Sequence, residues 1–180
     1  MGERATRRRE PSEHRFRALF AAHERAILAY ALRRVTDPVD AAEVVAETFL
    51  VAWRRLDDVA TGDGERPWLY GVARRVLANQ RRGYERRDRL RTRLGGLATR
   101  VVAEVAPPAG PTADERVAAA LDRLSDDDAE LLRLTYWDGL APRELALVFD
   151  LEPSSLRSRL TRARDRFRVQ FERTEKELQT

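Results

Sequence analysis

The chain has 180 residues, of which 43% are hydrophobic and 36% are charged, and its formal net charge is +4. It has no cysteine, which excludes disulfides, thiol catalysis and cysteine-bound metal clusters. No apolar run approaches the roughly 20 residues that span a bilayer, so we expect a soluble, cytoplasmic protein with no membrane insertion.

Arginine dominates the basic residues, because only Lys176 among the 34 is a lysine. The planar guanidinium group suits recognition of phosphates and bases. Codon choice in a GC-rich genome gives the same composition, so the placement of the arginines has to decide between the two interpretations.

The amino-terminal half predicts a tail and three helices. Residues 1–13 are basic with few apolar side chains, which indicates a disordered tail. Helical periodicity starts at Phe16 and is broken at residues 36–38. A second helix begins near Val39, and its predicted apolar stripe consists of Val45, Phe49, Trp53 and Leu56.

A polar loop and a long basic helix follow. Residues 57–66 form the loop, and Pro67 suits a first helical position. The helix extends to about Leu94, which closes a first domain of residues 14–94. The glycines and prolines of residues 95–112 then predict a flexible linker.

The carboxy-terminal half predicts four shorter helices in a second domain, residues 113–173, followed by a tail of residues 174–180. Ser125 is the predicted N-cap of the second of these helices. No strand pattern occurs in either half. The predicted fold is therefore all-α, with two small helical domains joined by a linker.

Residues 142–164 have the helix-turn-helix layout of a short helix, a three-residue turn and a longer helix. Asp150 suits the left-handed turn position. Ser154 and Ser155 can offer hydroxyl and backbone N–H groups to phosphate. An arginine-rich helix of a structural bundle is the alternative. The residues predicted to share an outward face near the start of the longer helix are Arg157, Ser158, Thr161 and Arg162.

The third helix of the first domain interleaves aromatic residues with arginines, a pattern that suits unstacked bases. Asn79 and Gln80 add amide groups that can read base edges. A core role for Trp68 and a merely solvated basic helix are the simpler alternatives.

Acidic residues recur at steps of three and four on the second helix, namely Asp40, Glu43 and Glu47. Val44 and Thr48 are predicted to lie exposed beside them. An acidic and apolar helix face is typical of a protein-docking surface. A plain solvated face is the alternative.

Catalytic and metal-binding patterns have no good candidates. The two histidines, His14 and His23, have no cysteine to complete a metal site. The acidic residues of the loop at residues 57–66 lack the spacing of a calcium-binding loop. No phosphate-binding or hydrolase motif occurs. We therefore expect no enzymatic activity, no cofactor and no metal.

Three segments carry a family resemblance. The segment DAAEVVAETFLVAWR (residues 40–54) resembles the polymerase-binding helix of bacterial sigma factors, and PWLYGVARRVLAN (residues 67–79) resembles their promoter-melting helix. Residues 121–164 resemble the second sigma domain with its helix-turn-helix. The order of the segments and the short chain resemble the extracytoplasmic-function (ECF) class.

The resemblance implies a sigma factor that binds core RNA polymerase and directs promoter-specific transcription initiation. The implied partners are promoter DNA, the beta-prime clamp coiled coil and the beta flap of the polymerase, and an anti-sigma factor. The implied clamp-binding residues are Asp40, Glu43, Val44, Glu47 and Thr48. The implied −10 residues are Thr61, Arg66, Trp68, Arg74, Arg75, Asn79 and Arg82. The implied −35 residues are Arg143, Ser154, Ser155, Arg157, Ser158, Thr161 and Arg162.

The sequence departs from the family pattern at four positions. Arg75 stands where asparagine is usual, which favours a phosphate contact over base reading, and Ala46 stands where glutamine is frequent. Ala141 and Glu152 are poor N-caps, which predicts less rigid helix starts. Residues 15–94 carry a net charge of +6 and residues 113–180 a net charge of −3. We therefore expect weak DNA binding by the free chain.

Two alternatives remain open at this point. A helix-turn-helix repressor or activator would bind a palindromic duplex without polymerase. An RNA-binding structural protein would retain RNA affinity without residues 113–180.

Overall fold

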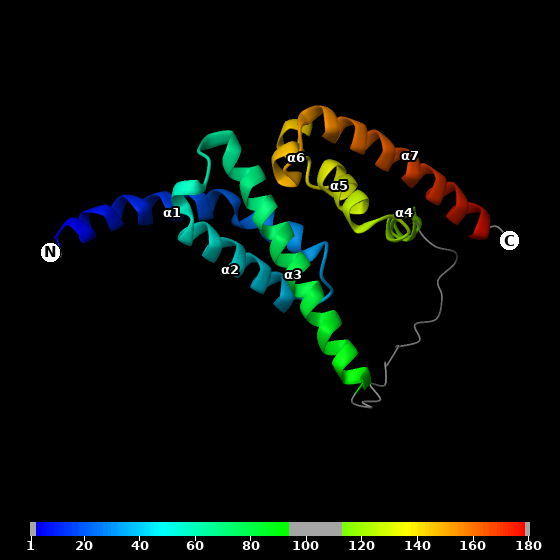
Figure 1. Cartoon of the computed structure of the whole chain (residues 1–180), viewed down its shortest axis with the longest axis horizontal. Helices are drawn as coiled ribbons and strands as arrows, with labels where there is room; N and C mark the ends of the chain where they lie inside the picture. The colour runs from blue at the N-terminus through cyan, green and yellow to red at the C-terminus, as the bar shows by residue number, and fades with distance from the viewer. Residues whose placement is uncertain (1–2, 94–112, 179–180) are drawn as a thin grey trace. The chain divides into compact units, whose positions relative to one another are not determined.

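Helices form every regular element in the described part of the chain (Figure 1). In this computed structural model the backbone is described for residues 3–93 and 113–178, and side chains for residues 12–83 and 114–177. The predicted all-α class is confirmed. The predicted linker at residues 95–112 lies outside the described residues.

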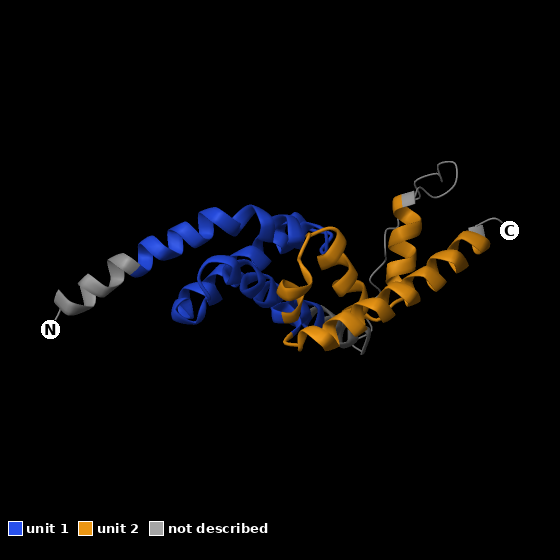
Figure 2. Cartoon of the chain, turned by 90° about the horizontal axis from the view of Figure 1, so that it is seen from above, with its two compact units in different colours: residues 1–95, 147–149 blue, residues 96–146, 150–180 orange. Residues whose placement is uncertain are grey.

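The chain divides into two compact units (Figure 2). Unit 1 comprises residues 1–95 and 147–149, and unit 2 comprises residues 96–146 and 150–180.

Unit 1 contains three long helices, α1 (Glu3–Leu32), α2 (Pro38–Arg54) and α3 (Glu65–Arg93). The connection between α2 and α3 contains two turns of 3-10 helix, Leu56–Asp58 and Gly62–Gly64. Each pair of the long helices is in contact, so the unit is a three-helix bundle.

The first helix differs from its prediction. The structure continues α1 through residues 3–13, where the composition predicts a disordered tail. Arginine and glutamate are strong helix formers, and extension of an existing helix requires no new nucleus.

The break between α1 and α2 is where the sequence predicts it. The Asp37 side chain accepts a hydrogen bond from the Val39 backbone N–H (2.8 Å), and Pro38 takes the first helical position, where no N–H is needed. This cap fixes the start of α2 and thereby the rotation of its faces.

Aromatic side chains hold the helices of unit 1 together. Phe49 on α2 is 3% exposed, and its ring centroid lies 4.7 Å from that of Phe20 and 6.3 Å from that of Phe16 on α1. Tyr30 on α1 and Tyr70 on α3 meet edge to face at 5.2 Å. Such edge contacts add about 0.5–1.5 kcal/mol per pair to the burial of the rings.

Unit 2 contains α4 (Ala113–Asp122), α5 (Asp126–Tyr136) and α7 (Pro153–Leu178), together with α6 (Pro142–Phe149) as far as Ala146. The long helix α7 packs against α4 and α5. An apolar stripe of α7 at helical spacing is buried in the core of the unit and includes Leu156, Leu160 and Ala163.

The helix starts of unit 2 are capped in two different ways. The Ser125 hydroxyl oxygen accepts the Asp128 backbone N–H (3.3 Å), as predicted for α5. At the start of α6, the Glu144 carboxylate accepts the Ala141 backbone N–H (2.7 Å). This is the half of a capping box in which the third helical residue bonds back to the N-cap, while Ala141 itself offers no side-chain acceptor, as the sequence indicates.

The turn between α6 and α7 has the predicted conformation. Asp150 has a φ of 53°, which is the left-handed position, and the Leu151 N–H bonds to the Ala146 carbonyl oxygen (2.9 Å). Helix, turn and helix therefore follow one another as the helix-turn-helix layout requires.

Candidate protein and nucleic-acid interfaces

The core side of α2 differs from its prediction. Val44 and Thr48 are both fully buried, so the prediction that they lie exposed is wrong. Trp53, predicted to lie on the buried stripe, is 41% exposed, although its ring still meets Phe16 edge to face at 5.2 Å. Apolar residues cover more than half of the circumference of α2, and its packing on α1 and α3 selects which of them are buried.

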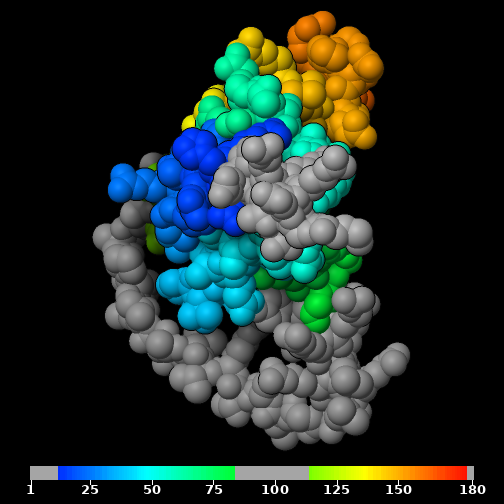
Figure 3. All heavy atoms as spheres, turned by 90° about the vertical axis from the view of Figure 1, so that its left-hand side faces the viewer, coloured from blue at the N-terminus to red at the C-terminus, as the bar shows by residue number. Residues whose placement is uncertain are grey.

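A different set of apolar residues lies beside the acidic ones. We define the α2 face by its exposed residues at helical steps of four, four and three: Val39, Glu43, Glu47 and Leu50. Val39 is 64% exposed and Leu50 is 45% exposed, whereas Asp40 is half-buried. The surfaces of α1 and α2 lie side by side on this part of unit 1 (Figure 3). The α2 face is therefore acidic and apolar, as the sequence predicts. Its exposed apolar residues are Val39 and Leu50, in place of the predicted Val44 and Thr48.

The loop before α3 is fastened at both ends. Arg15 on α1 donates to the Val59 carbonyl oxygen (2.6 Å), and His23 Nε2 lies 3.2 Å from a Glu65 carboxylate oxygen. Between them Gly62 has a φ of 64°, which favours glycine. Thr61 is exposed next to this glycine, so it occupies the outer part of a loop whose ends are held.

Four of the predicted −10 residues form one stripe on α3. We define the α3 stripe by residues spaced seven, four and three positions apart: Trp68, Arg75, Asn79 and Arg82. Trp68 is half-buried and the other three are exposed, with Arg82 donating a hydrogen bond to the side-chain amide oxygen Oδ1 of Asn79.

The other predicted −10 residues lie elsewhere. Helical spacing places Arg66 and Arg74 off the α3 stripe. The Arg66 guanidinium instead lies over the Tyr70 ring, 5.6 Å from its centroid. The structure thus brings together four of the seven predicted residues on one face, with Thr61 in the adjoining loop.

The predicted outward residues of α7 share one exposed surface, which we call the α7 face: Arg157, Ser158, Thr161 and Arg162. The Ser158 hydroxyl donates to the Ser154 carbonyl oxygen and the Thr161 hydroxyl to the Arg157 carbonyl oxygen, both at 3.1 Å. Each hydroxyl therefore presents an acceptor outward. The other predicted −35 residues are also exposed: Arg143 on α6, and Ser154 and Ser155 on α7.

Two arginines of α7 pair with carboxylates of α5 instead. Arg159 pairs with Asp127 (3.0 Å), and Arg166 pairs with the buried Asp128 (2.5 Å). From the sequence alone, both arginines would be assigned to the cationic surface of α7. Nothing in the sequence indicates these pairs, because each joins residues more than 30 positions apart.

An apolar groove lies between α4, α5 and α7, and its volume is about 540 Å³. Leu121, Phe167 and Phe171 contribute to its lining, and the exposed rings of Tyr136 and Trp137 stand at its side. The sequence analysis missed this groove, since its lining comes from three separate helices.

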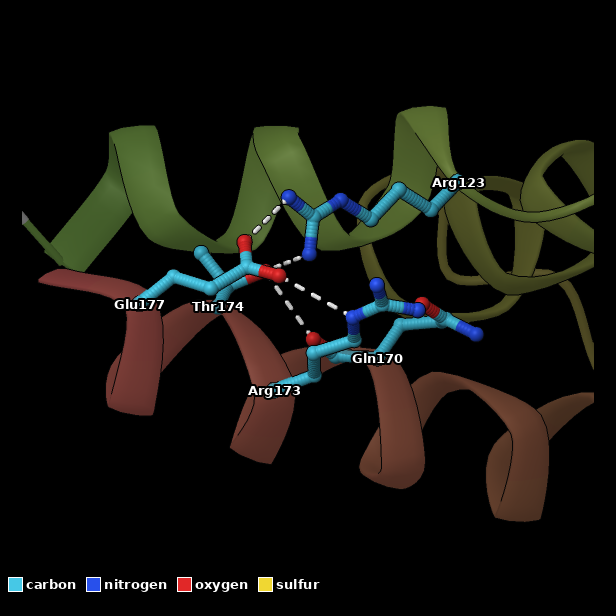
Figure 4. Close-up of polar contacts among 5 residues, drawn as sticks. All are labelled: Arg123, Gln170, Arg173, Thr174 and Glu177. Atoms are coloured by element: carbon cyan, nitrogen blue, oxygen red, sulfur yellow. Dashed lines mark hydrogen bonds and ion pairs between the residues drawn. The ribbon is translucent and has the colours of Figure 1, made fainter.

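A polar network joins α4 to the end of α7 (Figure 4). Arg123 donates to Glu177 (2.6 Å) and to Thr174 (3.2 Å), and Arg173 also pairs with Glu177 (3.0 Å). These hydrogen bonds, that from Arg123 first, hold the pKa of Glu177 below its ordinary value of 4.5. Arg123 directly follows α4, so the network connects two of the three helices that line the groove.

Among the described residues, no acidic and histidine side chains form a group that could hold a metal ion. No helix in this part of the chain combines the length and apolar character needed to cross a membrane.

Comparisons with known families match each unit to a separate family model. Residues 19–87 match Sigma-70 region 2, and residues 114–167 match Sigma-70, region 4. These two matches, in this order, favour the sigma-factor interpretation over the repressor and RNA-binding alternatives.

Solved structures share the fold. The sigma factor RpoE of Bartonella quintana, solved in complex with the anti-sigma factor NepR, has a TM-score of 0.61 at 24% identity and covers 87% of this chain and 96% of that one. CnrH, solved in complex with the cytosolic domain of CnrY, has a TM-score of 0.53 at 25% identity and covers 86% and 85%.

Curated relatives match over most of their length. The ECF RNA polymerase sigma factor SigL of Mycobacterium tuberculosis strain H37Rv is 32% identical over 80% of this chain and 81% of its own. The RNA polymerase sigma factor CnrH of Cupriavidus metallidurans is 32% identical over 85% and 84%. The chain therefore belongs to the ECF class of RNA polymerase sigma factors and is a promoter-recognising subunit of that enzyme.

Proposed function

We propose that this sigma factor uses three separate surfaces and the apolar groove of unit 2 for initiation. The α2 face binds the beta-prime clamp coiled coil of core polymerase. Thr61 and the α3 stripe hold the opened −10 element, and the α7 face reads the −35 element. The chain itself catalyses no bond change, and it acts in the cytoplasm, where its polymerase and promoter are found.

The observation that carries this proposal is the composition of the α2 face. Glu43 and Glu47 are exposed and make no ion pair within the described residues, and Val39 and Leu50 lie exposed beside them. Uncompensated acidic groups around apolar side chains suit a basic partner surface that also buries apolar area.

The α3 stripe combines an aromatic ring with cations and an amide. A half-buried indole offers a face on which an unstacked base can stack, and arginines nearby attract the strand backbone. The exposed Arg75 makes a phosphate contact in this scheme, while the Asn79 amide is the group suited to a base edge.

The groove in unit 2 provides the second contact with polymerase. Its apolar lining fits one side of a helix or loop of the beta flap, and the arginines beside it, Arg133, Arg164 and Arg168, suit acidic groups at the edge of that segment. An anti-sigma factor that covered the groove or the α2 face would compete directly with core polymerase.

Reversal of charge on the α2 face tests the proposal. The double variant Glu43→Arg, Glu47→Arg should bind core polymerase about tenfold or more weakly, because like charges across an interface cost several kcal/mol. The measurement is the dissociation constant with purified core polymerase, by fluorescence anisotropy of labelled chain.

A matched control is Glu172→Arg on α7, an exposed carboxylate that belongs neither to the three surfaces nor to the lining of the groove. Circular dichroism checks that each variant is folded, since exposed substitutions change stability by only about 0.5 kcal/mol. A folded double variant that binds core polymerase as tightly as the wild-type chain contradicts the assignment of the α2 face.

A further inference from the structure

One carboxylate of α5 is buried and shared between two arginines of α7. The Asp128 side chain is only 4% exposed, and its Oδ2 accepts a hydrogen bond from Arg166 Nη1 (2.5 Å). Its Oδ1 lies 3.7 Å from Arg159 Nε, and Asp127 holds the same Arg159 at 3.0 Å. A buried carboxylate is tolerated only when it is paired and hydrogen-bonded, and here each oxygen faces a guanidinium group.

The backbone of Asp128 is held in place by the N-cap of α5. The backbone N–H of Asp128 bonds to the Ser125 N-cap (3.3 Å), so the carboxylate projects from the capped first turn of α5. The position of Asp128 is thus set by local structure, before α7 is considered.

The ion pairs of these two arginines attach α7 to α5 at two points along the helix. Arg159 and Arg166 are seven residues apart, which is close to two helical turns, so they lie on one flank of the helix. Within the same two turns lie Thr161 and Arg162 of the α7 face, Thr161 on the far side of the helix and Arg162 between the two arginines. Because a helix rotates as a rigid body, any rotation at the flank moves the α7 face by the same angle.

We propose that Asp128 is a positioning residue for −35 recognition: by holding Arg159 and Arg166 it fixes the rotation of α7 about its axis. That rotation determines which base pairs the α7 face meets. The inference rests on the proposed function of the α7 face. It also removes Arg159 and Arg166 from the groups that bind DNA phosphates, although both belong to the recognition helix.

A purely structural ion pair makes a different prediction. It would change the stability of unit 2 and leave the base preference of folded molecules unchanged. A shift of a helix by a fraction of a turn alters which hydrogen bonds reach base edges, so a positioning role alters the preference itself.

The test is run-off transcription with core polymerase from a promoter library that has a randomised −35 element and a fixed −10 element. With Asp128→Asn, the use of the preferred −35 sequence relative to the library average should fall about fivefold or more, the effect of one mismatched base pair. A second library, randomised only in the −10 element, should show the wild-type preference.

Glu175→Gln is the matched control. It removes a carboxylate from another pair between α7 and its neighbour α4, that of Arg116 with Glu175 (3.4 Å), and should leave both preferences unchanged.

A second variant changes the arginine instead of the carboxylate. In Arg166→Gln, the glutamine amide can still donate to Asp128, which also faces Arg159, and circular dichroism checks that the unit is folded. Loss of one positive charge alone would weaken all promoters equally, whereas a rotated helix changes their ranking.

The outcomes separate the two hypotheses. A wild-type −35 preference that both folded variants keep would overturn the positioning role of Asp128 alone. A wild-type chain with no −35 preference would overturn the proposed function of the α7 face, and the positioning role with it.

Discussion

Helices α3 and α7 are both long and rich in arginine, yet their units hold them in place by different forces. In unit 1, α3 is held by buried apolar residues and by the contact of Tyr70 with Tyr30. In unit 2, α7 also has an apolar stripe, but ion pairs connect it to α4 and α5 along much of its length.

This difference predicts that the DNA-binding surfaces of the two units respond differently to salt and pH. Apolar packing is insensitive to salt, and it loses free energy mainly when volume is removed from the core. Ion pairs weaken as salt screens them and as their carboxylates take up protons. The orientation of the −35 surface should therefore depend on ionic conditions more than that of the −10 surface.

The largest expected effect comes from removing apolar volume in unit 1. Phe49→Ala should lower the free energy of unfolding of that unit by about 3–5 kcal/mol, because the ring is 3% exposed and contacts Phe16 and Phe20. Urea unfolding followed by circular dichroism measures the change, which should be the same at low and high salt.

Leu50→Ala, at the next position of α2, serves as its control. Leu50 is 45% exposed, so its truncation should cost far less stability while it weakens binding to core polymerase. Equal losses of stability for the two variants would contradict the division of α2 into a core side and an exposed face.

A smaller effect is expected on the α7 face. Arg157→Ala should cost about 1–3 kcal/mol of discrimination at one base pair of the −35 element, if the guanidinium pairs with both acceptors of a guanine. Arg157→Lys should keep general DNA affinity and lose most of this discrimination, because an ammonium lacks the fork geometry.

The measurement for both Arg157 variants is transcription from promoters that differ at single −35 positions. Equal loss at all promoters for Arg157→Ala would indicate a phosphate contact. In that case the α7 face would bind DNA through its charge and not through base contacts, as proposed for the cationic arginines of α3. The two units would then differ less.

Local sequence signals predicted a large part of the fold. The capping role of Ser125 and the left-handed conformation of Asp150 each depend on a few neighbouring residues, so they can be predicted from the sequence. The same holds for the all-α class. The early start of α1 was missed because charge and low hydrophobicity suggest disorder even where the residues favour helix.

Tertiary features of the candidate site could not be predicted in this way. Val44 and Val45 are adjacent on α2 and equally apolar, and only the packing of α1 and α3 decides that Val44 is the fully buried one. The pair of Asp128 with Arg166 spans 38 residues, and no local pattern distinguishes that arginine from Arg162 on the α7 face. The sequence therefore predicts the chemical character of a helix face, but it does not predict which residues belong to that face.

The smallest expected effect concerns the network at the end of α7. The pKa of Glu177 is lowered in the folded chain, chiefly by the hydrogen bond from Arg123, so folding favours the ionised carboxylate. The resulting stabilisation is fully present above the unfolded pKa, near 4.5, and is lost as the pH falls through the lower folded pKa. Glu177→Gln should therefore be less stable than the wild-type chain at neutral pH, with the difference vanishing in acid.

The effect of Glu177 should be modest, because both partners are solvent-exposed and screened. Urea unfolding at several pH values between about 6 and 3, at low and high salt, measures it. Glu172→Gln, an exposed carboxylate on the same helix, should show no such dependence. If the difference between Glu177→Gln and the wild-type chain persists unchanged in acid or in high salt, then packing of the side chain holds α7 to α4, and the two units are held by the same kind of force after all.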